Sequence, residues 1–314
     1  MDTNLFYSIQ SGPIWDWRVA VDLFAGGVGV GAFLFAILLS RFGEKRYQRL
    51  AQTAAIIAPF LVMLGLAFLF WKVGNKPNVY QMAINLAPTS MMWWGFLIQS
   101  ALVALGLIHA WQWLDRAPNA MRDKLGLLVG ALALLVGVYH GLVLAVLTSH
   151  PIWASGSMVF MAVLAFTTTG VAGAIVAHLL RMAVAGRSDE EGELAGYVDG
   201  LRPVRTVLLL ALVLMLANFF FWWVDLSYGS LESAQALAAA WSAYGPVLLL
   251  AGIGLGLVVP LVLITWFFGS APVNRPALTL SAIGLASLLV LVGGFAIRYA
   301  VVMGGQVSLP ISIF

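Results

Sequence analysis

Long apolar segments separated by short polar breaks run through the sequence from Trp17 to Met303. At roughly 20 residues or more, each segment is long enough to cross a bilayer as an α-helix. The pattern predicts an all-α membrane protein with eight transmembrane helices. Their expected ranges are 17–40, 52–73, 90–113, 124–148, 157–182, 204–226, 243–268 and 277–303. A further segment, Ser227–Tyr244, has the spacing of a short interfacial helix.

The composition agrees with this pattern. Charged residues make up 9% of the 314-residue chain, against about 25% in soluble domains, and hydrophobic residues make up 62%. The net charge of +3 does not indicate a nucleic-acid partner, because the basic residues lie at the ends of apolar runs. The chain has no cysteine, which excludes disulfides and Cys-ligated iron–sulfur clusters in this chain.

Lysine and arginine are distributed unequally between the two sets of predicted loops. Twelve of the 16 follow the first, third, fifth and seventh helices: Arg41, Lys45, Arg46, Arg49, Arg116, Arg122, Lys124, Arg181, Arg187, Arg202, Arg205 and Arg275. The other side carries Arg18, Lys72, Lys76 and Arg298. By the positive-inside rule the first set is cytoplasmic, so we expect both termini on the outer side of the membrane.

The predicted loop at residues 149–156 divides the eight helices evenly. We expect one four-helix bundle over residues 1–155 and a second over residues 156–314. The acidic stretch at 188–193 lies in the longest predicted cytoplasmic loop, as a solvated linker. The division into two halves, together with three prolines inside predicted helices (Pro59, Pro246 and Pro260), leaves a secondary transporter as one alternative function.

The glycine-rich run Gly26–Gly31 superficially matches a dinucleotide-binding fingerprint, but it lies inside an apolar span and no strand precedes it. Small residues four apart let transmembrane helices approach closely. We therefore expect the pairs Gly27/Gly31 and Gly252/Gly256 to be helix-packing positions.

Asp22 is the one acidic residue clearly inside an apolar span, about one turn from the outer end of its helix. Intramembrane charges are costly and usually face a cavity, a partner or a proton path. Arg18 lies four residues earlier, so the two side chains can pair on one helix face. The pair is either a structural ion pair or a protonatable group beside a bound ligand.

Tyr139 and His140 lie in the outer half of the helix at 124–148, and therefore at the depth of Asp22. Adjacent helical positions differ by about 100°, so both cannot point squarely at one ligand. Tryptophans gather near the same surface, where an aromatic belt also explains them; they are Trp15, Trp17, Trp93 and Trp94. Arg298, near the end of the last helix, is expected to reach outward to the interface or to a partner subunit.

Four histidines require that haem be considered, because a b-type haem takes paired histidine ligands. His140 and His150 are ten residues apart, about 15 Å along a helix, so one continuous helix cannot present both to one haem. His109 and His178, near the inner ends of their helices, leave a single haem conceivable. A b-type cytochrome is therefore a second alternative, and a purely structural anchor is a third.

Several motifs occur in an order that resembles the membrane subunit of the polysulfide reductase (NrfD-like) family. They are Trp15-Asp16-Trp17, the run Leu23–Phe33, Tyr139-His140-Gly141, His150-Pro151-Ile152-Trp153 and Arg298–Gln306. With eight spans and both termini outside, the resemblance covers essentially the whole chain.

The resemblance implies a subunit of the bacterial inner membrane with two four-helix bundles. It implies a quinone or quinol pocket (menaquinone or ubiquinone) near the outer face of the first bundle, without haem. It also implies a periplasmic iron–sulfur partner that serves a larger catalytic subunit, typically one with molybdopterin. Tyr139 matches the tyrosine expected to hydrogen-bond a quinone oxygen. Asp22 stands where polysulfide reductase is expected to have a histidine.

These observations predict the membrane anchor of a respiratory oxidoreductase, which is not catalytic on the terminal substrate alone. Quinol oxidation releases two electrons and two protons, so the pocket requires a proton acceptor and hydrogen bonds to the ring oxygens. We expect Asp22 to exchange the proton and Tyr139 to position the ring, with His140 and Arg18 as further quinone-binding residues and no metal ligand. Because no cysteine holds a cluster, the electrons must pass to or from a partner.

Overall fold

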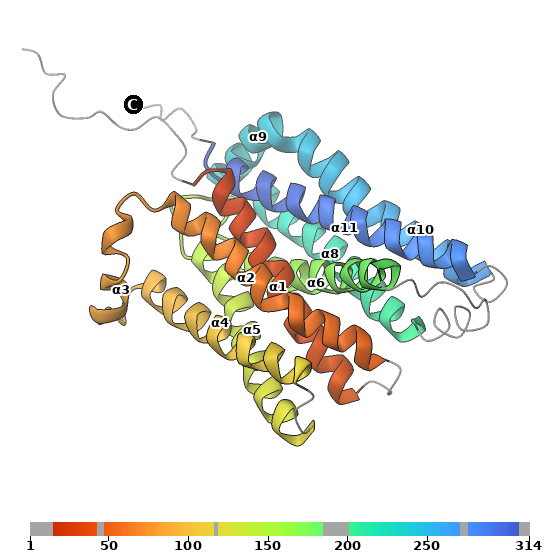
Figure 1. Ribbon diagram of the computed structural model, residues 1–314. Coiled ribbons are helices and arrows are strands. Elements are labelled where there is room, and N and C mark those ends of the chain that lie inside the picture. The colour runs from red at the N-terminus through yellow and green to blue at the C-terminus, as the bar shows by residue number, and fades with distance from the viewer. Residues whose placement is uncertain (1–14, 43–46, 116–118, 185–200, 271–275, 308–314) are drawn as a thin grey trace, which may run out of the picture.

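The computed structural model describes residues 15–42, 47–115, 119–184, 201–270 and 276–307, which form helices and no strand (Figure 1). Eight helical segments in these ranges are long and apolar enough to cross a membrane, which confirms the predicted number. They are α1 (Trp17–Phe42), α2 (Gln48–Lys72), α4 (Met91–Leu114), α5 (Asn119–Ala145), α6 (Ser157–Val184), α8 (Arg202–Tyr228), the continuous series α9 (Leu231–Pro246), η4 (Val247–Val258) and α10 (Val259–Ser270), and α11 (Pro276–Gly304). Two short helices, η3 (Lys76–Asn78) and α3 (Gln81–Ile84), lie between α2 and α4.

The seventh span differs from its prediction. The expectation of a separate interfacial helix at 227–244 is wrong, because α9 continues without a break into the apolar run that ends at Phe267. Ser230 begins this helix with a capping box in which Ser230 and Ser233 satisfy each other's backbone N–H groups. Pro246 lacks a backbone donor, and the turns directly after it have the wider π-helical geometry.

The most buried spans are α1 and α6, which pack against each other at glycines. A Cβ atom at Gly31 would overlap the backbone carbonyl of Phe166, and one at Gly170 would overlap Gly31. Gly256 and Gly293 meet in the same way between η4 and α11. The predicted packing role of both glycine pairs is confirmed, because these sites admit no side chain.

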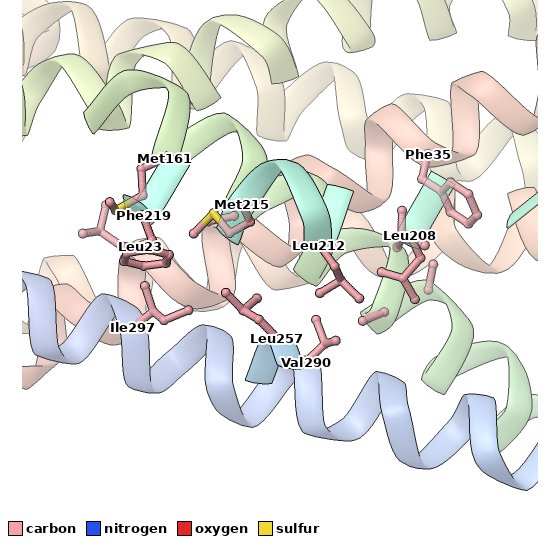
Figure 2. Close-up of a cluster of buried hydrophobic side chains, with 14 of the residues drawn as sticks. Leu23, Phe35, Met161, Leu208, Leu212, Met215, Phe219, Leu257, Val290 and Ile297 are labelled. Carbon is pink, nitrogen blue, oxygen red and sulfur yellow. The ribbon is translucent and has the colours of Figure 1, made fainter. Parts of the chain in front are cut away.

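Apolar side chains from α1, α6, α8, η4 and α11 form a continuous core (Figure 2). On α8 the buried residues recur every three to four positions, which places them on one face; they include Leu208, Leu212, Met215 and Phe219. At one end of this core, Leu23, Met161 and Ile297 point toward one another from α1, α6 and α11 (Figure 2).

Three segments that are far apart in the sequence meet at one end of the helices, which we call the terminal face. Trp15 N–H donates to the Gln306 side chain at 2.7 Å, and the Gln306 amide donates back to the Trp15 carbonyl at 2.8 Å. The Trp15 ring stacks on Trp153 with centroids 5.1 Å apart, and His150 Nδ1 lies 2.9 Å from the Gly305 carbonyl. The two described chain ends therefore lie on the same side, as an even number of spans requires.

Some predictions concern residues outside the described ranges, namely the acidic stretch at 188–193 and five of the twelve basic residues. Those five are Lys45, Arg46, Arg116, Arg187 and Arg275. The division into bundles at residues 155/156 and the membrane side of the terminal face stay predictions. Across the proposed division, α1 packs against α6 as well as against α2.

Candidate functional site

Asp22 lies on α1 five residues after its first residue, about 8 Å along the helix from the terminal face. The residue is only 4% exposed. A Cβ atom at Gly65 of α2 would lie 2.9 Å from both the backbone carbonyl and a carboxyl oxygen of Asp22, so glycine at this position leaves the space that the carboxyl group occupies. Within the described residues, no hydrogen bond or ion pair reaches this carboxyl group.

Tyr139 approaches the same place from α5. Its hydroxyl group occupies the space that a side chain at Gly95 of α4 would need, and Tyr139 lies close enough to Asp22 for electrostatic interaction. The structure therefore places the two residues that the sequence put at one depth within electrostatic range of each other. The site is built from α1, α2, α4 and α5, and two glycines make room for its polar groups.

Gln99 is a polar residue that the sequence reasoning missed. It lies one helical turn from Gly95 on α4, so the two share a face, and only 6% of Gln99 is exposed. Buried side-chain amides need hydrogen-bond partners. In the sequence, Gln99 is an uncharged polar residue inside an apolar span. Such a residue indicates a functional site less strongly than a charged residue does.

Arg18 does not pair with Asp22, so that expectation is wrong. Its guanidinium instead lies 2.8 Å from Asp16, and Lys72 lies 3.3 Å from the same carboxylate. Side chains on a helix lean toward its N-terminus, which carries Arg18 away from Asp22 and toward the helix end. Partial burial raises the pKa of Asp16, but hydrogen bonds from Arg18 and Lys72 outweigh it and leave that pKa below its usual value.

His140 leaves α5 on a different side from Tyr139. Its ring packs edge-on against Phe166 of α6, with centroids 5.5 Å apart, and is only 4% exposed. Neither ring nitrogen makes a hydrogen bond of acceptable geometry with the described residues, although the Val136 carbonyl, one turn back, is near the ring.

Arg298 is buried as well, so the expectation that it reaches outward is wrong. The guanidinium turns back along α11 and donates to the Gly294 carbonyl at 2.9 Å and to Thr169 Oγ1 of α6 at 3.3 Å. Its carbon Cζ lies 5.3 Å from the centroid of the Phe166 ring. The backward lean of helical side chains directs a residue near a helix C-terminus into the membrane.

His140 and Arg298 line a cavity of about 40 Å³ between α1, α5, α6 and α11. The remaining lining is apolar: Leu23, Leu144, Met158, Met161, Ala162, Ala165, Phe166, Ile297, Val301 and Val302. The Phe166 ring also fills the space between α1 and α5, where it excludes a side chain at Gly27 and comes within 3.1 Å of a Cβ atom at Gly137. Polar groups near the terminal face thus form two clusters.

The other two histidines have neighbours of their own. His109 packs beside Trp113 and against Gly126 of α5, and His178 Nδ1 lies 3.3 Å from Thr53 Oγ1 of α2. In the described part of the chain, no three histidine or acidic residues are grouped as metal ligands.

Comparison with known proteins matches residues 4–310 to the family described as polysulphide reductase, NrfD. The chain belongs to the NrfD family. Protein NrfD of Escherichia coli is 28% identical over 94% of this chain and 96% of that protein. A polysulfide reductase chain of Wolinella succinogenes is 25% identical, over 93% of this chain and 94% of the relative. A selenate reductase subunit of Mesobacillus selenatarsenatis is 26% identical over a shorter region, 34% of this chain and 24% of the relative.

Membership of the NrfD family agrees with the eight apolar helices and makes this chain a multi-pass integral membrane protein. The function class that the match supports is a membrane subunit of a respiratory reductase complex. Three of the motifs on which the resemblance rested meet at the terminal face through Trp15, Trp153 and Gln306. In this NrfD-family chain the Asp22–Tyr139 cluster lies directly below that face.

Proposed function

We propose that this chain is the quinone-reactive membrane subunit of a respiratory oxidoreductase, and that it oxidises quinol or reduces quinone at Asp22 and Tyr139. One observation carries the proposal. The carboxyl group of Asp22 on α1 and the hydroxyl group of Tyr139 on α5 occupy spaces left by Gly65 and Gly95, within electrostatic range of each other. A buried carboxyl group without a partner in the described structure is expensive to keep and is typical of a site that exchanges protons.

Each residue has a chemical role in this reaction. A quinone site needs a group that takes or gives the proton of a ring hydroxyl and a group that holds a ring oxygen. Asp22 exchanges the proton, and Tyr139 donates a hydrogen bond to the oxygen. Arg18 lies toward the terminal face with Asp16 and Lys72. These three charged side chains form a polar rim, through which the proton leaves the site.

The electrons require a partner, because a chain without cysteine cannot hold an iron–sulfur cluster on thiolates. We propose an iron–sulfur subunit that docks on the terminal face, on the periplasmic side of the inner membrane, and serves a larger, molybdopterin-type catalytic subunit. The relatives from polysulfide reductase and selenate reductase, each named as one chain or subunit of its enzyme, support an assembly of this kind. Menaquinone or ubiquinone is the electron carrier.

The test compares two activities of the intact complex. Asp22→Asn and Tyr139→Phe are expected to lower quinol-linked turnover about 100-fold and about tenfold, because they remove the proton acceptor and one hydrogen bond respectively. Activity of the catalytic subunit with an artificial dye, which bypasses the membrane subunit, stays unchanged. Asp115→Asn and Tyr228→Phe are matched controls at exposed positions. Normal quinol turnover in both site variants contradicts the proposal.

A further inference from the structure

We propose that the cavity between α1, α5, α6 and α11 is a second ligand site, which binds the head group of a lipid-soluble quinone or quinol through His140 and Arg298. It is separate from the Asp22–Tyr139 cluster of the proposed function. The two sites use adjacent residues of α5 that leave the helix about 100° apart.

His140 supplies the first part of the argument. Both imidazole nitrogens are buried without a hydrogen bond of acceptable geometry to the described residues, although the Val136 carbonyl is near the ring, and the ring faces the cavity. Buried polar groups in native proteins are almost always satisfied, and an orphaned one calls for an explanation such as a ligand. A neutral imidazole offers one donor and one acceptor, so it can bind either a carbonyl or a hydroxyl group.

Arg298 supplies the second part. Its hydrogen bonds within the described residues engage two of five N–H groups, both through oxygen atoms of uncharged groups. No described carboxylate forms an ion pair with it. The rings of Phe24 and Phe166, with centroids 5.6 and 5.3 Å from Cζ, stabilise the cation in part. An oxygen of a ligand would engage the donors that remain.

The positions of the His140 imidazole and the Arg298 guanidinium indicate which kind of ligand fits between them. They project from different helices, α5 and α11, and both contact the ring of Phe166. A ring with an oxygen at each end can satisfy His140 and Arg298 together, while its apolar body contacts the leucine, isoleucine and methionine side chains of the lining. A fatty acid has both oxygens at one end, so it would pair with Arg298 and leave His140 unsatisfied.

The depth of the cavity argues against a phospholipid head group. The 29 residues of α11 span about 43 Å, which exceeds the hydrocarbon thickness of about 30 Å. Arg298 lies six residues, or about 9 Å, before the end of α11, and its guanidinium turns back farther to Gly294. The polar groups thus lie below the phosphate level, at a depth where an uncharged ring is far less costly to bury than a phosphate.

The experiment uses the full chain in lipid nanodiscs with a photoreactive azidoquinone, and locates the labelled peptides by mass spectrometry. We expect label in segments 158–166 and 297–302. His140→Leu and Arg298→Met each remove a polar partner and are expected to lower this label about tenfold or more, whereas Ser287→Ala, a buried change elsewhere on α11, leaves it unchanged. Thermal unfolding without quinone shows which variants fold. If Arg298→Met does not fold, the labelling of His140→Leu decides the test.

The outcomes separate this proposal from the proposed function. Label that persists in Asp22→Asn supports a second site, whereas label lost there as well overturns it, because a single site would then account for both. Absence of label from the two segments in the wild-type chain also overturns it. So does displacement by oleate or phosphatidylglycerol but not by unlabelled quinone. Normal quinol turnover in Asp22→Asn with the label intact overturns the proposed function alone.

Discussion

Tyr139 and His140 are neighbours in the sequence, yet they belong to two differently built regions. Tyr139 and Asp22 fill spaces left by glycines on adjacent helices, in a tightly packed cluster. His140 and Arg298 instead border a small cavity with apolar walls. Both regions contain a buried ionisable group without a salt bridge to the described residues, and a cavity lies beside the second of them.

This difference shows that buried polar side chains alone do not define a ligand site. The carboxyl and hydroxyl groups of the first region occupy spaces left by glycines on α2 and α4, so that region depends on how those two helices pack. The His140–Arg298 region instead borders a cavity of about 40 Å³. The contact between α1 and α6 is common to both regions, whereas the glycine spaces on α2 and α4 belong to the Asp22–Tyr139 region alone.

The largest effect is expected from Gly31→Ala, because both regions depend on the contact between α1 and α6. A Cβ atom there would overlap the backbone of α6, which cannot move aside as a flexible side chain can. We expect a loss of about 3 kcal/mol or more in the free energy of unfolding, measured by thermal unfolding in detergent. Gly156→Ala, where nothing lies within 4 Å of the added atom, is the control; equal stability of the two variants would contradict this packing.

Gly65→Ala is expected to have a smaller and selective effect. The added methyl group would come within 2.9 Å of the Asp22 carboxyl group, the Asp22 carbonyl and the backbone nitrogen of Gly26, so α2 must move away from α1. Quinol-linked turnover should fall about tenfold at a stability cost of about 1–3 kcal/mol, with azidoquinone labelling of 158–166 retained. Gly74→Ala, in open space, serves as the control. Equal losses of turnover and label would show that the regions are one site.

The smallest effect is expected at the rim, from Asp16→Asn. The pKa of Asp16 is lowered in the folded chain, so its stabilising contribution is present above the unfolded value near 3.8 and is lost as the pH falls through the lower folded value. Partly exposed ion pairs contribute little, and we expect a loss below about 1 kcal/mol at pH 7. Thermal unfolding at pH 7 and pH 3 should show a difference between variant and wild type that shrinks at the lower pH. A constant difference would assign the effect to packing.

Much of the fold follows from apolar segment length alone, since a membrane admits few backbone arrangements. The exception was the seventh span, where the polar character of Ser227–Tyr244 suggested a separate element. The sequence does not show that a serine capping box starts a helix which then continues through Pro246 into the apolar run. A cap specifies where a helix starts but not how far it extends.

The site was only partly predictable. The rarity of acids inside spans identified Asp22, and helical depth grouped it with Tyr139. Helical spacing also suggested a pair between Arg18 and Asp22, but the lean of side chains toward the helix N-terminus directs Arg18 to Asp16 instead. The same lean turns Arg298 inward. The sequence also predicted that Tyr139 and His140 diverge by about 100°. Which neighbouring helix each side chain faces depends on tertiary packing, so the contact of His140 with Phe166 required the structure.

The hydrogen bonds between Trp15 and Gln306 have a consequence for how the protein is made. Residues next to the first helix are held by residues that follow the last, and Trp153 from the middle of the chain lies between them. During synthesis the first helix enters the membrane long before Gln306 exists. The terminal face above Asp22 therefore closes only after α11 and Gln306 have been synthesised, and a chain that stops before α11 leaves that face open.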